Sequence, residues 1–314
     1  MIEMEWVLII GFIAAGIRTS APLMLASLGE TIVERGGILN LGIEGAMLIG
    51  AFTGFMGAFL TGNLWIGLLM AIIGGILTVL TFGILVVRIN LDQVVSGLAI
   101  NLLAAGLCLY FFRLAFSQGT FPYLSELIGP YPIPLLSQIP VIGEVLFNQT
   151  IFVYVGIVSV PITYYLIFKT SYGLKLRSVG EDPLVASYLG IEVSRIRYTA
   201  LILEGIFVGM AGGLLCLSMF NVFDTRIVAA RGFVAVSIVI LGRWNPVGAF
   251  AGSLLFGFTE ALSLWIGTFL IGPASASISQ LLSLLPYLVT LIALLIGGRR
   301  VRGPAALGSP FSKE

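Results

Sequence analysis

Three glutamates lie inside stretches of the sequence that are otherwise apolar enough to cross a membrane: Glu44, Glu204 and Glu260. An ionisable side chain at mid-bilayer is unfavourable by several kcal/mol unless it faces protein or water, so each of the three is a candidate site residue. Such a carboxylate can bind a polar solute, carry a proton, or clasp a neighbouring helix through hydrogen bonds. The sequence leaves these roles open, and with them the class of proton-driven secondary transporters.

Three uncharged polar residues belong to the same set: Asn40, close to Glu44, and Asn101 and Ser237 in other apolar stretches. Each can line a pathway, or can form an ordinary hydrogen bond between helices, typically worth about 0.6 kcal/mol. The predicted substrate pathway therefore consists of six residues: Asn40, Glu44, Asn101, Glu204, Ser237 and Glu260.

The residue types that catalysis usually needs are missing from the sequence. It contains no histidine and no P-loop, which argues against hydrolytic chemistry and against ATP binding in this chain. Cys108 and Cys216 both lie in apolar runs, as buried thiols do, and imply neither a metal site nor a disulfide framework. We therefore expect no catalytic residue, no metal and no cofactor, and the net charge of +1 argues against nucleic acid as a partner.

A polar, basic segment, residues 169–197, separates two long apolar runs. Within it, Asp182 can cap a helix, Pro183 suits its first turn, and Gly190 can end it. The apolar residues of this helix share one face: Leu184, Val185, Tyr188 and Leu189. Such a helix fits a groove on a soluble partner, or lies in the membrane interface as an ordinary loop helix.

Composition and apolar runs define the elements that position these residues. With 58% hydrophobic and only 10% charged residues, against roughly 25% charged in soluble domains, the sequence predicts an all-α polytopic membrane protein. A helix needs about 20 apolar residues to cross the bilayer. The stretch 6–28 is one expected span, although Arg18 and Pro22 interrupt it. Residues 229–242 are short for a full span and suit a half-helix that lines a cavity. We expect eight to ten membrane helices, with nine as the preferred number. The clear spans are 43–60, 64–87, 93–116, 150–168, 198–220, 246–270 and 281–298.

The distribution of basic residues predicts the orientation. Of the 16 basic residues, five lie in 169–197 and four follow residue 298, so both regions are assigned to the cytoplasm. Residues 117–149 contain no Lys or Arg and are interpreted as an extracytoplasmic loop. Counting spans back from that loop places the N-terminus outside.

Four blocks of sequence resemble one known family in the same order along the chain. The stretch ASLGETIVERGGILNLGIEGAMLIGAF (26–52) is similar to the signature of inner-membrane permeases of ABC importers, in the branched-chain amino acid, ribose and nucleoside superfamily. The other blocks are QVVSGLAINLL (93–103), GLKLRSVGEDPLVASYLGI (173–191) and GFVAVSIVILGRWNPVGAF (232–250). The resemblance is greatest to the nucleoside and simple-sugar group.

The resemblance implies a single permease domain over residues 1–314, of the second importer type, with 169–197 as a coupling segment that docks on a separate ATP-binding subunit. It carries the coupling motif onto six positions: Gly180, Glu181, Asp182, Pro183, Ala186 and Gly190. With the helix-face residues Leu184 and Tyr188, they form the predicted coupling surface.

The function implied is that of a multi-pass subunit in the cell membrane, which forms half of a translocation pore. The resemblance further implies a second, related permease as the other half (a heterodimer) and an extracytoplasmic solute-binding protein. The spans hold scattered Asn, Ser, Thr and carboxylates but no cationic cluster for phosphate, which suits a small, uncharged polar solute. Nucleosides are the first expectation and simple sugars such as ribose the second. A secondary transporter or passive channel would need no coupling helix, so that helix argues against both.

Overall fold

The structure is a computed structural model that describes residues 2–116, 122–269 and 302–311, together with separate residues between 282 and 295. Within this part of the chain, seven helices are long and apolar enough to cross a membrane. They are α1 (Ile2–Arg35), α2 (Ile43–Thr61), α3 (Leu64–Gly83), α4 (Gln93–Ala115), α6 (Ile151–Lys169), α9 (Val193–Leu214) and α11 (Pro246–Phe269). The all-α polytopic fold is confirmed, whereas the expected span 281–298 falls largely outside the described residues.

Shorter elements connect and extend these helices. A π-helical turn continues each of α3 and α9, and neither turn was expected from the sequence. The short elements are η1 (Ile84–Arg88), β1 (Pro130–Pro132), η2 (Leu136–Gln138), α5 (Ile142–Leu146), β2 (Asn148–Thr150), α7 (Ser171–Glu181), α8 (Pro183–Tyr188), η3 (Leu215–Met219) and α10 (Arg231–Leu241). Helix α10 has 11 residues and so spans about 16 Å, roughly half of the hydrocarbon core. The expected half-helix is therefore present.

Helix α1 differs from its prediction. The expected interruption at Arg18 and Pro22 is wrong, because α1 runs as one helix of 34 residues to Arg35. Proline removes one backbone donor from a helix, and tertiary packing can offset that loss. Almost all side chains between Ala14 and Glu34 are buried against the rest of the bundle. Two further glutamates are consequently carried into the interior.

Small residues let α2, α3 and α9 approach closely. A Cβ on Gly209 of α9 would lie 2.5 Å from the carbonyl oxygen of Ala71 on α3. A Cβ on Gly75 of α3 would lie 2.5 Å from the carbonyl oxygen of Gly205, one turn earlier on α9. Such close backbone approach is the main way in which helices associate in lipid. Gly205 and Gly209, which are four residues apart on α9, therefore form a ridge along which the helices pack.

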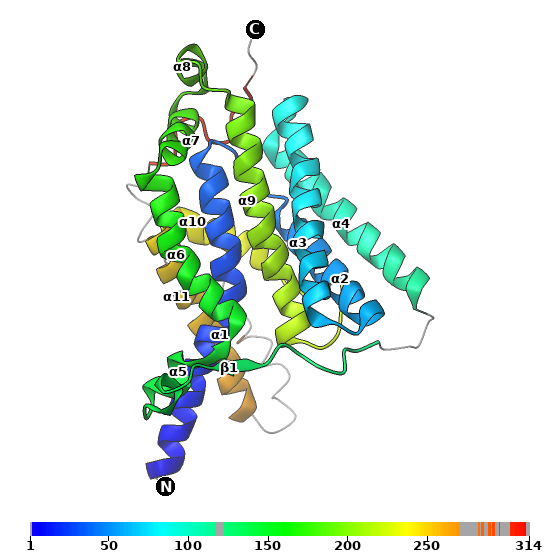
Figure 1. The fold of residues 1–314 in the computed structure, drawn as a ribbon, viewed down its shortest axis with the longest axis vertical. Helices are drawn as coiled ribbons and strands as arrows, with labels where there is room; N and C mark the ends of the chain where they lie inside the picture. Colours follow the sequence, from blue (N-terminus) through cyan, green and yellow to red (C-terminus); the bar gives the residue numbers. More distant parts are fainter. Residues whose placement is uncertain are drawn as a thin grey trace.

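The two ends of the bundle carry different segments (Figure 1). Helices α7 and α8 lie at one end, where residues 302–311 join them through a hydrogen bond from the Ala306 N–H to the Gly180 carbonyl (2.9 Å). The β1–β2 pair and α5 lie at the other end, with the start of α1. The charge pattern predicts this separation of the basic segments from residues 117–149. That the first end faces the cytoplasm stays a prediction.

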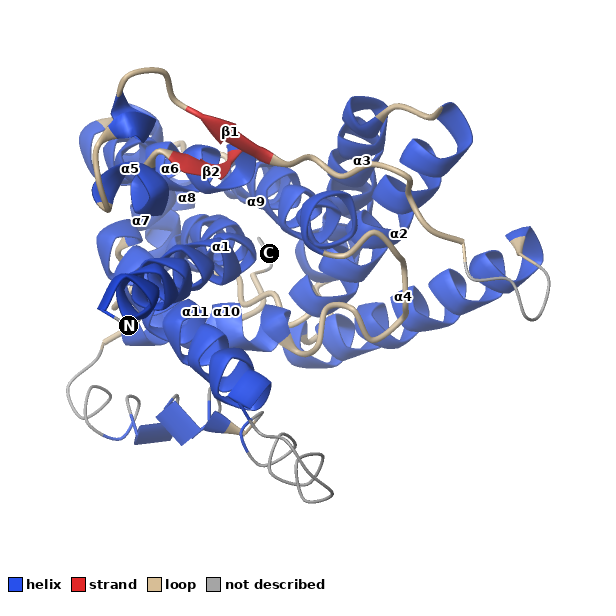
Figure 2. Cartoon of the chain, turned by 90° about the horizontal axis from the view of Figure 1, so that it is seen from below, coloured by secondary structure: helices blue, strands red, loops and turns tan. Residues whose placement is uncertain are grey.

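Figure 2 looks along the bundle from the end that holds the strands. Helices α4, α10 and α11 lie along one flank, and the two strands lie along the opposite flank. The strands are tied to α1, because the side chain of Gln149 accepts a hydrogen bond from Arg18 (3.0 Å). Three residues of the predicted pathway lie on the helices of this flank: Asn101 on α4, Ser237 on α10 and Glu260 on α11.

Candidate functional site

The first part of the candidate site is the start of α10, inside the membrane-spanning bundle. A helix begins with backbone N–H groups that have no partner within the helix, and its dipole favours an anion there. Glu44, in the first turn of α2, supplies that anion. Its two carboxylate oxygens accept hydrogen bonds from the N–H groups of Ala230 (2.9 Å) and Gly232 (2.7 Å). Glu44 therefore clasps α10 to α2.

The turn that precedes α10 is strained. Ala229 and Ala230 have φ angles of 51° and 60°, in the left-handed region that alanine rarely adopts. Gly232, two residues further on, has no room for a side chain, because a Cβ there would lie 2.6 Å from Cα of Glu44. Strained backbone persists only where surrounding contacts hold it, and it is frequent at functional sites. Here the contacts come from the Glu44 carboxylate.

Arg231 links α10 to α11. One of its terminal nitrogens, Nη1, donates to the carbonyl oxygens of Ile227 and Val228, both at 3.1 Å. The other, Nη2, forms an ion pair with the carboxylate of Glu260 on α11. Both side chains are largely buried, so removal of either partner would leave an uncompensated charge. The carboxylate of Glu260 is thus held by a cation that the sequence reasoning did not pair with it.

Asn101 joins α4 to the same place. Its side-chain oxygen accepts from the N–H of Gly45 (2.7 Å), and its side-chain nitrogen donates to the carbonyl of Leu41 (2.8 Å). Since Gly45 follows Glu44, the contacts run in a row from α4 through the start of α2 to the start of α10. Asn101 and Glu44 are both half-exposed, so this row reaches the surface of the chain.

Ser237 lies further along α10. Its hydroxyl donates to the carbonyl of Phe233 on the same helix (3.1 Å), and both side chains are at least partly exposed. Of the residues predicted for the pathway, Glu44, Asn101, Glu260 and Ser237 therefore gather around α10.

Asn40 and Glu204 belong to a different place, a network buried between α1, α9 and the turn after α1. The Asn40 side chain donates to Glu204 (2.8 Å), and its backbone N–H donates to Glu30 (3.1 Å). Glu34, one turn after Glu30, accepts a hydrogen bond from the indole N–H of Trp244. All three carboxylates have no exposed surface. They cannot contact a solute in this arrangement.

Sequence reasoning missed Glu30 and Glu34. The first span was expected to end at residue 28, which left both glutamates outside the membrane. Their spacing of four residues, which places them on one helix face, was the available signal.

The second part of the candidate site is α8, at the end of the bundle. Asp182 caps α8 by accepting from the N–H groups of Leu184 and Val185, both at 3.0 Å. Pro183 is in the first turn, and Gly190 has the left-handed φ of 82° that ends the helix. The predicted local structure is therefore confirmed. We refer to α8 as the coupling helix, after the role that the resemblance to ABC permeases implies for it.

One face of the coupling helix is exposed and apolar. The side chains of Leu184 and Val185 are 51% and 52% exposed, and that of Tyr188 is 84% exposed. Leu189, at the end of the helix, is also exposed. On the other face, Ala186 is buried among apolar residues of α7 and α9. The helix thus presents a small apolar surface outside the spanning region.

Helix α7, which the sequence did not predict, fixes the coupling helix to the bundle. Gly180 has no room for a Cβ, because the carbonyl of Arg35 at the end of α1 occupies that position. The hydroxyls of Tyr172 on α7 and Thr199 on α9 lie 3.1 Å apart. Burial raises the pKa of Tyr172, so its hydroxyl stays neutral at physiological pH. Gly180 of the coupling motif is therefore a packing residue in this structure.

The sequence model of one protein family, described as the branched-chain amino acid transport system / permease component, matches residues 12–295. The chain belongs to this permease family.

Curated relatives of this permease are similar over most of their length. The guanosine ABC transporter permease protein NupQ of Bacillus subtilis is 34% identical over 94% of both chains. The nucleoside ABC transporter permease protein NupC of Lactococcus lactis is 35% identical over the same share. A glucose ABC transporter permease protein of Haloferax volcanii, TsgC13, whose assignment is provisional, is 35% identical over 81% of this chain and 77% of its own.

The fold of the permease is also found in a solved structure. An inward-facing ABC transporter assigned to the metal-chelate type has a TM-score of 0.51 and 16% identity, with 91% of this chain and 85% of that chain covered. Taken with the seven spanning helices, family membership makes this chain a multi-pass plasma-membrane protein and a transport subunit, not an enzyme.

Proposed function

We propose that this permease is the membrane subunit of an ATP-driven importer of nucleosides. The observation that carries the proposal is the coupling helix. It exposes Leu184, Val185 and Tyr188 at the end of a membrane-spanning bundle, and two relatives of this chain are named as ABC transporter permeases. In this proposal a separate ATP-binding subunit covers that apolar face, and the closing of the ATPase moves the helix.

The solute pathway that we propose passes the start of α10. A half-helix that begins inside the membrane is a frequent construction for solute sites in transporters. Asn101 and Glu44 supply polar atoms there, Ser237 supplies a hydroxyl further along α10, and Phe233 supplies an aromatic ring that is 39% exposed. Ribose hydroxyls suit the amide and hydroxyl groups, and a nucleobase can stack on the ring. Asn40 and Glu204, which were also predicted for the pathway, would support it from the buried network.

The relatives favour nucleosides. Two of them are similar to this chain over most of its length and are named as guanosine and nucleoside permeases. A simple sugar is the second candidate, because the glucose permease protein of Haloferax volcanii is equally identical over a shorter share. Both solutes are uncharged and polyhydroxylated.

The other half of the pore is, in this proposal, a second and different permease. Two guanosine permease proteins of Bacillus subtilis resemble this chain, NupQ with 34% and NupP with 25% identity. The flank formed by α4, α10 and α11 is the face that we assign to the partner, since it holds the half-exposed pathway residues (Figure 2). A solute-binding protein would deliver solute at the end that holds the β1–β2 pair.

Uptake into proteoliposomes tests this function. The permease is reconstituted with the ATPase, second permease and binding protein encoded beside it, and is offered radiolabelled guanosine, uridine, adenosine, ribose and glucose. We expect accumulation of the nucleosides with ATP and none with a non-hydrolysable analogue. Accumulation of a sugar alone would select the second candidate. Uptake that is indifferent to ATP would overturn the proposal in favour of a proton-driven carrier or a channel.

A further inference from the structure

The described residues near the C-terminus, 302–311, lie along the end of the bundle that carries α7 and α8 (Figure 1). We call this segment the carboxy-terminal strap. It has no regular secondary structure beyond turns, so its position depends on contacts with other elements. The solute pathway and the coupling helix proposed above do not include it.

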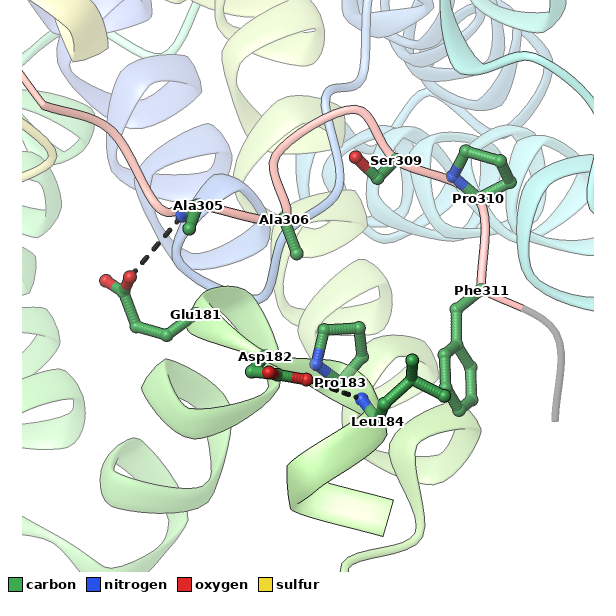
Figure 3. A pocket seen from close by; sticks show the side chains of 9 residues that line it. All are labelled: Glu181, Asp182, Pro183, Leu184, Ala305, Ala306, Ser309, Pro310 and Phe311. Atoms are coloured by element: carbon green, nitrogen blue, oxygen red, sulfur yellow. Dashed lines mark hydrogen bonds between the residues drawn. The ribbon is translucent and has the colours of Figure 1, made fainter.

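The strap is bonded to the end of α7, directly before the coupling helix. The N–H of Ala306 donates to the carbonyl of Gly180 (2.9 Å), and the N–H of Ala305 donates to the carboxylate of Glu181 (3.4 Å). Figure 3 shows Glu181 reaching towards Ala305. Two consecutive strap residues are thus tied to two consecutive residues of the coupling motif.

The last described residue of the strap contacts α9 and the coupling helix. The ring of Phe311 lies 5.9 Å from the guanidinium of Arg197, a side chain that is only 1% exposed. Two nitrogens of that guanidinium, Nε and Nη2, have no hydrogen-bond acceptor among the described residues. Phe311 also packs on the apolar cluster that contains Ala186 of the coupling helix. The ring therefore covers a buried cation, an arrangement that is most favourable when water is excluded.

The strap also reaches the elements that carry the pathway. The carbonyl of Ser309 accepts from the side chain of Gln93 (3.3 Å), in the first turn of α4. Gln93 is buried, and it accepts in turn from the N–H of Leu39 (2.7 Å). A Cβ on Gly303 would lie 2.8 Å from the indole of Trp244, in the turn between α10 and α11. The strap is thus in contact with the ends of α4 and α10.

A cavity of about 300 Å³ separates the strap from the start of the coupling helix (Figure 3). It is lined by residues 181–184 on one side and by residues 305–306 and 309–311 on the other. The strap is therefore fixed at its two ends and at α7, and between these ties the cavity separates it from the coupling helix. The coupling helix has space on this side to change its tilt while those ties persist.

We propose that the carboxy-terminal strap is a positioning element that passes displacement of the coupling segment to α4 and to the α10–α11 turn. The proposal rests on the proposed function, in which an ATPase moves the coupling helix. Coupling between separated sites requires an element whose arrangement both sites bias. The strap meets that requirement, because its hydrogen bonds join the coupling motif to α4, which carries Asn101, and its Gly303 packs against Trp244 in the turn after α10, which carries Ser237. Phe311 is its anchor.

The test compares three variants of the reconstituted complex. Phe311→Ala removes the anchor, Phe311→Tyr keeps an aromatic ring, and ending the chain after residue 301 removes the strap. Ending the chain after residue 311 is the control for truncation. Each complex is assayed for ATPase retained on purification and for solute transported per ATP hydrolysed.

We expect Phe311→Ala and the 301 truncation to retain the ATPase while transport per ATP falls at least about fivefold, the lower end of typical coupling between sites. Phe311→Tyr and the 311 truncation should match the unmodified chain. An unchanged ratio in Phe311→Ala would overturn the proposal, because the strap would then only pack. Loss of the ATPase from Phe311→Ala would overturn it too, since the strap would then be a docking surface.

A separate variant keeps this outcome distinct from failure of the proposed function. Leu184→Asp with Tyr188→Asp alters the coupling helix and changes no residue of the strap. If that double variant keeps its ATPase, the proposed docking on the coupling helix is wrong whatever the strap variants do. If it loses the ATPase and the strap variants transport normally per ATP, only the strap proposal is overturned.

Discussion

The coupling helix and α10 are both short helices with a carboxylate at the N-terminus, yet the two carboxylates come from different parts of the chain. Asp182 caps the coupling helix from within the same segment, at 3.0 Å from two successive N–H groups. The carboxylate at α10 comes from Glu44, 186 residues away from Ala230 in the sequence. A local cap stabilises a helix with residues of its own segment, whereas a remote clasp ties two spans together. The first construction suits a moving contact and the second a fixed pathway wall.

The largest effect should come from the exposed face of the coupling helix. Leu184→Asp with Tyr188→Asp places two charges where we propose that an apolar groove of the ATPase closes. Burying an unpaired carboxylate costs several kcal/mol, so binding of the ATPase should weaken at least about a hundredfold. Copurification of the ATPase measures this, with the amount of permease in the membrane as the reference.

The matched control for this variant is Leu174→Asp, a change of the same kind on the exposed surface of α7. It should leave the ATPase bound. Equal loss in both variants would show that any charge at this end disrupts the complex, and the contrast between the two short helices would lose its basis.

The next effect should come from the clasp at α10. Glu44→Gln leaves one acceptor oxygen for two backbone N–H groups. The amide N–H₂ then faces the second N–H, and neither group can accept a hydrogen bond. A partly buried N–H without an acceptor costs about 1–3 kcal/mol, which should appear as lower thermal stability and reduced uptake. Glu126→Gln, at an exposed position, is the control. Full stability in Glu44→Gln would mean that the carboxylate does not hold α10.

The same contrast explains what could be predicted from the sequence. The coupling helix was predicted residue by residue, because Asp182, Pro183 and Gly190 lie within eight residues of one another and act through local backbone bonds. Glu44 was recognised as a polar residue in an apolar run, but its partners on α10 could not be identified. Neither could the Arg231–Glu260 pair, which depends on how α10 and α11 cross. Hydrogen bonds within one segment can be predicted from the sequence. Partners on different helices can be identified only when the packing of those helices is known.

Helix α1 shows the same limit from another direction. Pro22 and Arg18 are local signals for an interrupted span, and both were overridden by burial of the surrounding residues. That error in turn excluded Glu30 and Glu34 from the candidate residues. The buried network around Asn40 and Glu204 was therefore only half visible in the sequence.

A smaller effect should separate the cap from the charge at the coupling helix. Asp182→Ala removes the acceptor for two N–H groups and should destabilise the helix by about 1 kcal/mol, or roughly fivefold in ATPase binding. Asp182→Asn keeps an equally good cap and should bind the ATPase normally. If Asn fails as Ala does, the charge of Asp182 contacts the ATPase and the helix is not defined by its cap alone.

The smallest change in stability should accompany the sharpest test of the pathway. Among the described residues, the hydroxyl of Ser237 donates only to the carbonyl of Phe233 on its own helix, so Ser237→Ala should alter stability by less than about 0.5 kcal/mol. If its hydroxyl also contacts the ribose of a nucleoside, losing that hydrogen bond should raise the KM for uptake about threefold to tenfold at unchanged kcat. Ser178→Ala removes the same type of intrahelical bond from α7, outside the spans, and should leave KM unaltered. An unchanged KM in Ser237→Ala would show that the hydroxyl of Ser237 does not contact the solute, and the middle of α10 would then be a structural element beside the pathway and not part of its wall.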